Sequence, residues 1–267
     1  MSLSASIVLH KTPVQQLLKA VNLLLESPIE KIFLIDNSPE DSLRNSIPSD
    51  IRIEYHHVEN HGFGSGHNIA LNEILKDSSD ENSFHLVMNA DVWWDGDVIT
   101  PLIDYLKQNP EVGMVMPKVF YPDGSLQYTA RLLPTPYDVF AKRFFPTKLI
   151  EKRMERYLLK KKDHDEEFNC PYLLGSFLLF RNSALKDCGV FDERFFMYPE
   201  DIDITRRLHR KWKTMYWPGV SIVHEHAAAS RKNLRMLWIH SLNMVRYFNK
   251  WGWFTDPERK FFNRRLK

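Results

Sequence analysis

The chain has 267 residues, enough for one large domain or for one domain with an appendage. Its 36 Lys and Arg residues nearly balance 34 Asp and Glu residues, and the net charge of +2 gives no overall attraction to nucleic acid. Two cysteines exclude a disulfide framework and favour a reduced, cytosolic setting. No secretory signal is visible, and no apolar run approaches the ~18 residues of a membrane span.

The first half of the chain alternates short apolar runs with helical patterns. The predicted strands are Ala5–Leu9, Lys31–Ile35, Ile51–His56 and Phe84–Met88, and the predicted helices are Val14–Leu25 and about Gly66 to Leu75. This alternation indicates a mostly parallel α/β sheet, in which ligands bind beyond the carboxyl ends of the strands. Three polar segments lie at such ends, namely Asp36, Asn60–Asn68 and Asn89–Asp91.

The second half is less regular. The patterns predict short strands at Gly113–Pro117, Thr214–Trp217 and Ser221–Val223, a further apolar run at Leu173–Phe180, and a turn with an amphipathic helix over Phe191–Trp212. The residues after Leu234 have a helical pattern rich in Trp, Phe and Arg. Basic residues gather in Lys142–Lys162 and in Arg231–Lys267, and such local surfaces suit phosphates or anionic lipid.

Three carboxylates, Glu200, Asp201 and Asp203, follow an aromatic turn within four positions. One interpretation is a helix N-terminus, where acids interact favourably with the helix dipole and arginines one turn later supply partners. The other is a functional site, because acids this close together repel one another unless a cation, hydrogen bonds or catalysis require them. The segment alone leaves both open.

The loop from Asn60 to Asn68 contains three glycines in five residues and is neither a Walker loop nor a dinucleotide-binding loop. It predicts either a backbone that passes close to a ligand or an ordinary tight turn before a helix. Asn89-Ala90-Asp91 follows a predicted strand, where a carboxylate suits a divalent metal on a nucleotide diphosphate. His224 and His226 are candidates for metal or phosphate contact, although a buried, hydrogen-bonded histidine is the commoner role.

Read in order, these motifs resemble the inverting family 2 glycosyltransferases of the GT-A fold, close to the bacterial rhamnosyltransferases. The segments that carry the resemblance are Asp36-Asn37-Ser38-Pro39-Glu40-Asp41, Asn60 to Asn68, Met88-Asn89-Ala90-Asp91, Gly175 to Arg181, Gly189 to Asp203 and Pro218 to His224. Together they cover roughly residues 4 to 230. Each motif is modest, but six in the right order are specific.

The resemblance implies an α/β, GT-A architecture with a mostly parallel central sheet flanked by helices. Residues 1–230 would form the glycosyltransferase domain, in which 1–115 bind the nucleotide-sugar and 116–230 bind the acceptor. Residues 231–267 would add a basic, aromatic helical extension.

The resemblance also implies site roles. Asp201 would be the catalytic base and Glu200 would assist it by hydrogen-bonding the acceptor or the donor sugar. Asp91 and His224 would hold a divalent metal, Mn²⁺ or Mg²⁺, on the donor diphosphate. The implied donor contacts are Asp36, Asp41, Asn60, Gly62, Gly66, Asn68, Asn89 and Asp91, and the implied acceptor contacts are Gly175, Tyr198 and Glu200. Asp203 would have a capping or structural role.

The chain departs from the family pattern at two places. Leu9-His10-Lys11 stands where many relatives have Thr-Tyr-Asn, so the nucleobase contacts there are open. Asn89 replaces the first Asp of the usual D-x-D, which removes one charge from the metal site, and His226 instead of His224 is an alternative ligand.

The expected activity is transfer, with inversion, of L-rhamnose from dTDP-rhamnose to a lipid-linked saccharide in the synthesis of a bacterial surface polysaccharide such as O-antigen. A UDP- or GDP-hexose donor is the alternative within the class. A non-catalytic nucleotide-sugar-binding subunit is the alternative outside it, although the presence of Asp91, Glu200 and Asp201 together argues against that. A sugar nucleotidyltransferase is rejected, because Leu9–Pro13 contains no glycine.

The aromatic, basic tail, Asn243–Trp253 and Phe261–Arg265, also has two interpretations. It packs on the core, as Trp and Phe at helical spacing usually do, or it contacts the inner membrane through aromatic and cationic side chains. Because family acceptors are often lipid-linked, we expect peripheral contact with the cytoplasmic face of that membrane.

Overall fold

The computed structural model describes residues 2–77, 82–144, 147–225 and 234–266. The strands are β1 (Leu3–Leu9), β2 (Lys31–Asp36), β3 (Ile53–His57), β4 (Phe84–Met88), β5 (Val92–Trp93), β6 (Val112–Phe120), β7 (Ala130–Arg131), β8 (Phe168–Asn169), β9 (Tyr172–Leu173), β10 (Phe177–Arg181) and β11 (Lys213–His224). The helices are α1 (Val14–Leu25), the short 3₁₀ turn η1 (Arg44–Ser46), α2 (Phe63–Asp77), α3 (Ile99–Gln108), α4 (Pro136–Phe144), α5 (Thr147–Tyr157), α6 (Asn182–Cys188), α7 (Glu200–Leu208), α8 (Leu234–Trp251) and α9 (Pro257–Arg264).

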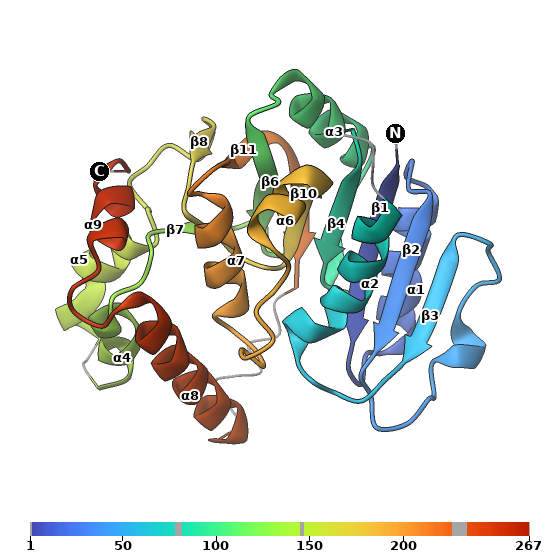
Figure 1. The fold of residues 1–267 in the computed structure, drawn as a ribbon, viewed down its shortest axis with the longest axis horizontal. Helices are drawn as coiled ribbons and strands as arrows, with labels where there is room; N and C mark the ends of the chain where they lie inside the picture. The colour runs from blue at the N-terminus through green and yellow to red at the C-terminus, as the bar shows by residue number, and fades with distance from the viewer. Residues whose placement is uncertain (1, 78–81, 145–146, 226–233, 267) are drawn as a thin grey trace.

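The central sheet has the strand order β3-β2-β1-β4-β10-β6-β11-β5, and β8 pairs with β11. Strands β1 to β4 pair in parallel, and β10 is antiparallel to both β4 and β6. Two successive antiparallel pairings return β6 to the direction of β4, and β11 runs parallel to β6. The carboxyl ends of β1 to β4 and of β11 therefore meet at one edge of the sheet, the lower edge in Figure 1.

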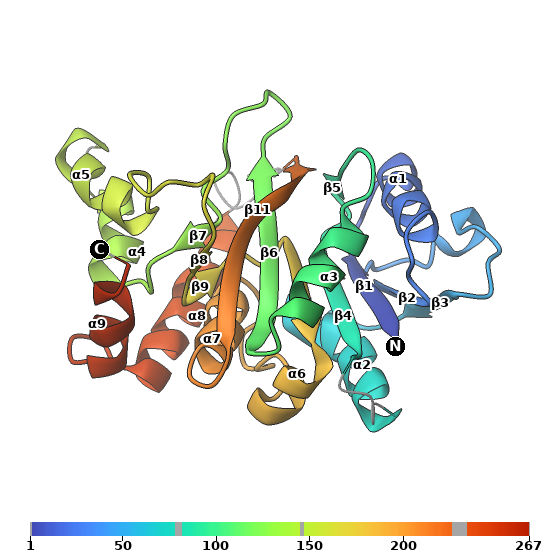
Figure 2. The same ribbon diagram turned by 90° about the horizontal axis from the view of Figure 1, so that it is seen from above.

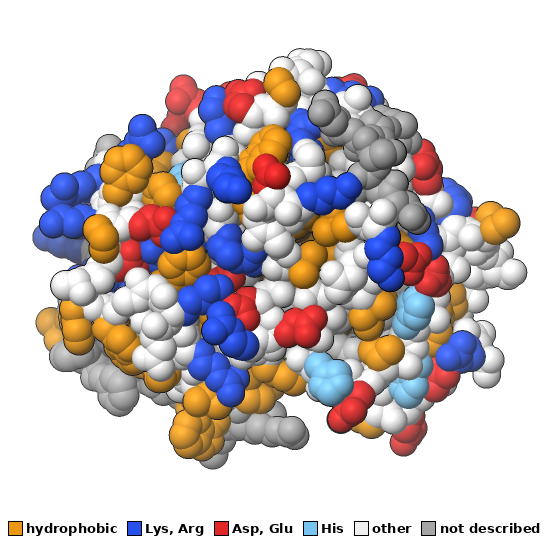
Figure 3. Space-filling view, viewed as in Figure 1, with side chains coloured by type: hydrophobic (Ala, Val, Ile, Leu, Met, Phe, Trp, Pro, Cys, Tyr) orange, Lys and Arg blue, Asp and Glu red, His pale blue; other side chains and the backbone are white. Residues whose placement is uncertain are grey.

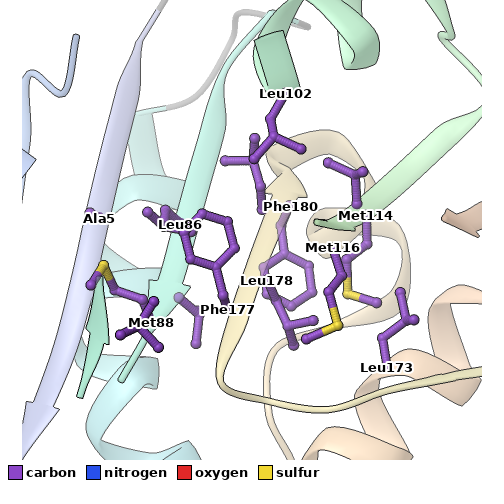
Figure 4. Packing of buried hydrophobic residues seen from close by; sticks show 14 of the residues in the cluster. Ala5, Leu86, Met88, Leu102, Met114, Met116, Leu173, Phe177, Leu178 and Phe180 are labelled. Carbon is purple, nitrogen blue, oxygen red and sulfur yellow. The ribbon is translucent and has the colours of Figure 1, made fainter. Parts of the chain in front are cut away.

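The central strands form where the sequence is mostly apolar, because both faces of the sheet are covered there. Every residue of β4 and of β10 is buried. Helix α1 lies on one face, and α2, α6 and α7 lie on the other (Figure 2). Side chains from β4, β10 and β6 pack together in the centre, among them Leu86, Phe180 and Met114 (Figure 4).

A second core joins the C-terminal helices to β9 and α7. Met244, Tyr247 and Phe248 of α8 are buried with Tyr172 of β9 and Ile202 of α7. The extension predicted for residues 231–267 therefore shares its core with the preceding domain in the part that the structure describes. Within Asn243–Trp253, Tyr247 and Phe248 are fully buried, in agreement with packing on the core. Within residues 234–266, the large exposed apolar side chains are Trp238, Leu242, Phe254 and Phe261.

Two predicted elements differ from the structure. Helix α2 begins at Phe63 and not near Gly66, so Gly64 and Gly66 lie in its first turn. The two strands predicted at Thr214–Trp217 and Ser221–Val223 are one strand, β11, with a register shift between Trp217 and Ser221. Pro218 lies at this irregularity, because proline has no N–H to donate to a neighbouring strand.

A buried polar network lies between α2 and the sheet. Ser6 of β1 bonds to ring nitrogens of both His67 and His85, each at 2.7 Å, and Ser4 bonds to the other nitrogen of His85 at 2.7 Å. Burial lowers the pKa of His85 to about 3 and that of His67 well below its usual value. Both imidazoles are therefore neutral, and the network fixes the start of α2 against β1.

Candidate active site

The predicted site residues of the first half gather at the carboxyl edge of the sheet. Asp36 ends β2, Asp91 follows β4, and the loop from Asn60 leads into α2. His224, at the end of β11, lies opposite Val92 in the register of β5. The topology therefore brings together residues separated by more than a hundred positions in the chain.

Asp36 and Asp41 share a partner that the sequence analysis missed. The Tyr55 hydroxyl lies 2.8 Å from Asp36 Oδ2 and 2.7 Å from Asp41 Oδ1. Asp36 is fully buried, and its Oδ1 accepts from the Ser38 N–H at 2.8 Å. Burial and the two carboxylates raise the pKa of Tyr55, whereas hydrogen bonds from Tyr55 and Arg44 lower the pKa of Asp41. The two acids implied at the nucleoside are thus adjacent, and Tyr55 holds them in place.

The glycines of the Asn60–Asn68 loop meet the segment before α7. Gly62 has φ +104°, and a Cβ on it would lie 2.2 Å from the Phe196 carbonyl oxygen. A Cβ on Gly66 would lie 2.7 Å from Val8. Close packing against protein therefore accounts for these two glycines, and the ligand contact inferred for them stays a prediction.

The asparagines of this loop also have protein partners. Asn60 Oδ1 accepts from the Gly62 N–H at 3.0 Å. Asn68 is buried, donates to the Phe191 carbonyl at 2.9 Å and accepts from the Phe191 N–H at 3.0 Å. Its side chain thus ties α2 to the segment that leads into α7, and its implied contact with the donor stays a prediction.

Asp91 and His224 form the candidate metal pair. His224 Nε2 lies 3.3 Å from Asp91 Oδ1, and its Nδ1 lies 2.7 Å from Gln127 Oε1. With Nδ1 donating to Gln127, the lone pair of Nε2 faces the carboxylate, an arrangement that suits a cation between them. Asn89 is half-buried, and its N–H donates to the Ser176 carbonyl. Gln127 had not been predicted.

One carboxylate and one imidazole are few ligands for a metal. Within the described ranges, no group of three or more His, Cys, Asp or Glu side chains is placed to hold a metal ion. The pair nevertheless fits a cation that takes its other ligands from a diphosphate, since magnesium and manganese accept phosphate and water oxygens. His226, the alternative ligand, lies outside the described residues.

Glu200 and Asp201 begin α7 and are both buried. Asp201 Oδ2 accepts from the Gly175 N–H at 3.0 Å, and Oδ1 accepts from the Ile202 N–H at 2.7 Å. A Cβ on Gly175 would lie 3.1 Å from Asp201 Cβ, so a glycine allows this close approach. Burial raises the pKa of Asp201 to about 7.

Glu200 has a different environment from its neighbour. Its Oε2 is buried without a hydrogen-bond partner in the described part of the chain. Burial and the adjacent charge of Asp201 raise the pKa of Glu200 well above its usual value. Two carboxyl groups whose environments separate their proton affinities are typical of an acid–base site.

The residues around this pair hold it rigidly. Tyr198 has φ +91°, a conformation that non-glycine residues rarely adopt, and its ring meets that of His240 edge to face at 4.8 Å between ring centres. Asp203 accepts from Arg207 and Trp251, each at 2.8 Å, and lies 2.6 Å from Lys250. Asp203 therefore has the structural role expected of it.

The chain matches the family described as glycosyl transferase family 2 over residues 7–189. It is 28% identical over 240 residues to the N-acetylglucosaminyl-diphospho-decaprenol L-rhamnosyltransferase of Mycobacterium tuberculosis, covering 82% of this chain and 74% of that protein. It is 23% identical over 188 residues to a low-salt glycan biosynthesis hexosyltransferase of Haloferax volcanii, covering 69% of this chain and 55% of that protein.

Two solved structures share the fold. GalNAc-T7 with UDP, GalNAc and Mn²⁺ has a TM-score of 0.56 at 16% identity, over 84% of this chain and 43% of that one. The mannosyltransferase PcManGT of Pyrobaculum calidifontis with GDP-Man and Mn²⁺ has a TM-score of 0.55 at 15% identity, over 93% of this chain and 63% of that one.

This chain therefore belongs to glycosyl transferase family 2 and is a glycosyltransferase. The GT-A fold predicted from the motifs is confirmed, as is the resemblance to rhamnosyltransferases.

Proposed function

We propose that this family 2 glycosyltransferase is an inverting, metal-dependent enzyme that transfers L-rhamnose from dTDP-rhamnose to a lipid-linked saccharide. The observation that carries the proposal is the pair of buried carboxyls, Glu200 and Asp201, which two adjacent residues link to the metal side of the site. The Gly175 N–H donates to Asp201, and the Ser176 carbonyl accepts from the Asn89 N–H, two residues before Asp91. The choice of rhamnose and of a lipid-linked acceptor rests on the relative of M. tuberculosis, whose name states both.

Asp201 is suited to be the base of a single displacement. In that reaction the acceptor hydroxyl oxygen bonds to the anomeric carbon, the bond from that carbon to the donor phosphate breaks, and Asp201 takes the hydroxyl proton. A carboxyl with a pKa of about 7 is matched to proton transfer at neutral pH. One displacement inverts the anomeric configuration and requires no covalent nucleophile.

Glu200 is suited to bind rather than to take the proton. Burial raises the pKa of Glu200 and so favours the neutral carboxyl, which can donate a hydrogen bond to a sugar oxygen. Gly175 and Tyr198 flank the same turn and remain the proposed acceptor contacts.

Asp91 and His224 would hold the divalent metal, with Gln127 fixing the imidazole through Nδ1. When bound to the donor diphosphate, such a metal offsets the charge of the leaving group as a Lewis acid. Asp36 and Asp41 lie at the other end of the same edge, where the nucleoside would be bound.

A donor screen tests this proposal. The purified protein is incubated with a polyprenyl-diphosphate-linked N-acetylglucosamine acceptor and with dTDP-rhamnose, UDP-hexoses or GDP-hexoses, with Mn²⁺ or with EDTA. We expect transfer from dTDP-rhamnose alone, its loss in EDTA, and an anomeric configuration in the product opposite to that in the donor by NMR. Transfer from a UDP- or GDP-hexose instead would favour the hexosyltransferase alternative, for which the relative of H. volcanii gives support.

We also propose that the enzyme works in the cytoplasm, in peripheral contact with the cytoplasmic face of the inner membrane. None of the described helices has the length and apolarity to cross a bilayer. Exposed apolar side chains at Trp238, Leu242 and Phe254 are joined by cationic ones over α7 and α8, and hydrophobic side chains also gather at the lower end of α8 (Figure 3). Apolar and cationic groups together suit an anionic lipid surface.

Vesicle sedimentation tests the membrane contact. We expect the protein to sediment with vesicles that contain anionic lipid, to sediment less at raised salt, and to sediment less after Trp238→Ser together with Phe254→Ser. The matched control is Ile51→Ser, which removes an exposed apolar side chain from the opposite half of the molecule. Absence of sedimentation at every salt concentration would contradict the membrane contact while leaving the transferase reaction intact.

A further inference from the structure

Arg131 is held in one position beside the catalytic turn. It lies on β7 opposite Tyr172 of β9, and β9 leads directly to Gly175. Its Nε donates to the Tyr128 carbonyl at 3.0 Å, and its guanidinium lies 5.8 Å from the centre of the Tyr172 ring. A carbonyl and a phenol ring thus fix a cation that is only half-exposed.

The charge of Arg131 has no direct counter-charge. Among the described residues, no carboxylate oxygen lies within 4.0 Å of a guanidinium nitrogen of Arg131. The fold brings Arg131 to the turn that holds Asp201, because β9, which pairs with β7 at Arg131, leads to Gly175, and the Gly175 N–H donates to Asp201 Oδ2 at 3.0 Å. The charges of Arg131 and Asp201 act on each other across this distance. Arg206, by contrast, is matched directly by Asp256 and Glu258. Because an unmatched cation in a partly buried place is costly, its position beside Asp201 calls for a reason.

Glu200 and Asp201 lie next to each other, and a single displacement needs only one of them as its base. Both are buried, and either could in principle take the proton of an acceptor hydroxyl. The N–H groups of Gly175 and Ile202 bond to Asp201, whereas Oε2 of Glu200 has no partner in the described structure. We propose that Arg131 is a positioning residue that keeps Asp201, and not Glu200, as the carboxylate that accepts the proton. This inference rests on the proposed role of Asp201 as the base.

Ionisable groups on four of the described elements interact electrostatically with Asp201. They are Glu200 on the same helix, Arg131 on β7, Tyr172 on β9 and Tyr157 on α5. Burial raises the pKa of Tyr157 to about 12 and that of Tyr172 well above its usual value, so both phenols stay neutral near pH 7. Arg131 is thus the cation of this group.

Carboxyl NMR tests the inference without substrate. Protein labelled with ¹³C at the Asp carboxyl carbons is titrated in a Glu200→Gln background, which removes the coupling between the two acids. The Asp201 signal is assigned by its loss in Asp201→Asn. We expect Arg131→Met to raise the pKa of Asp201 by about one unit, a tenfold change in proton affinity, and Arg131→Lys to restore most of it. The matched control is Arg153→Met, since Arg153 pairs with Asp138 and should leave the titration unchanged.

The outcomes separate this inference from the proposed function. An Asp201 titration that is the same with Met and with Arg at position 131 overturns the inference, and so does a rise in the acceptor KM of Arg131→Met without a shifted titration. If Arg131→Met does not fold, Arg131→Gln gives the same comparison. Absence of transfer from every donor by the wild-type protein would count against the proposed function only, because the titration is read without turnover.

Discussion

The first and last turns of α7 treat buried charge in opposite ways. In the last turns, Arg206 is 1% exposed and bonds to both oxygens of Asp256 at 2.7 and 2.8 Å, with Glu258 at its Nε. In the first turn, Glu200 and Asp201 are equally buried but have no cation in contact among the described residues. One helix therefore carries a buried cation with its counter-charges at one end and two buried acids without a contacting cation at the other.

The difference fits the role proposed for each end of the helix. Paired charges such as Arg206 and Asp256 join α7 to α8 and α9, and thereby fix the direction of the helix. Unpaired acids lower stability, because burial favours their neutral form. A fold retains such acids where their proton affinity is used, which is the basis for assigning the chemistry to the first turn.

The largest expected effect is the loss of transfer in Asp201→Asn. The amide cannot take the acceptor proton, so we expect kcat to fall by about 10²–10⁴-fold while the Kd of the donor stays unchanged. Asp203→Asn is the matched control, with the same change of charge two residues later, and should reduce stability with little effect on kcat. Equal losses of kcat in both variants would show that Asp201 has no role in catalysis beyond that of Asp203.

Breaking the paired end should act on stability. Asp256→Asn leaves Arg206 buried with one fewer counter-charge, and we expect the free energy of unfolding to fall by about 3 kcal/mol in urea titrations. Glu111→Gln removes a carboxylate from an exposed pair with Lys213 and should cost about 0–1 kcal/mol. If Asp256→Asn lowered the free energy of unfolding by no more than this control, the ion pair of Arg206 with Asp256 would not be what holds α7 in place.

The pH dependence of the first turn follows from the raised pKa of Asp201, about 7. A folded-state pKa above the unfolded value means that the stabilising contribution is present below about pH 4 and is lost as the pH rises through about 7. Transfer has the opposite dependence, since the base must be ionised. We therefore expect kcat/KM to rise across pH 6–8 while thermal stability falls, with a slope of up to about 1.4 kcal/mol per pH unit for each proton. Asp201→Asn should reduce the slope of stability, and an unchanged slope would contradict the assignment.

The smallest expected effect is that of Glu200→Gln. Because burial raises the pKa of Glu200 and so favours its neutral form, the amide is a close substitute, and we expect transfer to stay within about tenfold of the wild type. Removing a buried acid should also raise the melting temperature, by about 2–4 °C for each kcal/mol gained. A loss of transfer as large as that of Asp201→Asn would instead identify Glu200 as the base.

Much of the framework follows from local patterns. Phe84–Met88 is a strand in the structure as predicted, because a continuous apolar run suits a strand covered on both faces. The six ordered motifs predicted the family and the fold, which are confirmed. The start of α2 was misplaced by three residues, since Gly64 and Gly66 disfavour a helix locally and are accepted for the close packing that they allow.

The sequence by itself determined the order of strands and helices, the family and the candidate acids of the proposed site, because hydrophobic spacing and motif order are local properties. Tertiary structure decided how far the proton affinities of these acids are shifted and which residues contact them. Tyr55, Gln127 and Arg131 belong to no motif, and each meets its partner only after distant segments have packed. Burial and the positions of neighbouring charges set the proton affinities of Glu200 and Asp201, and neither can be read from a linear chain.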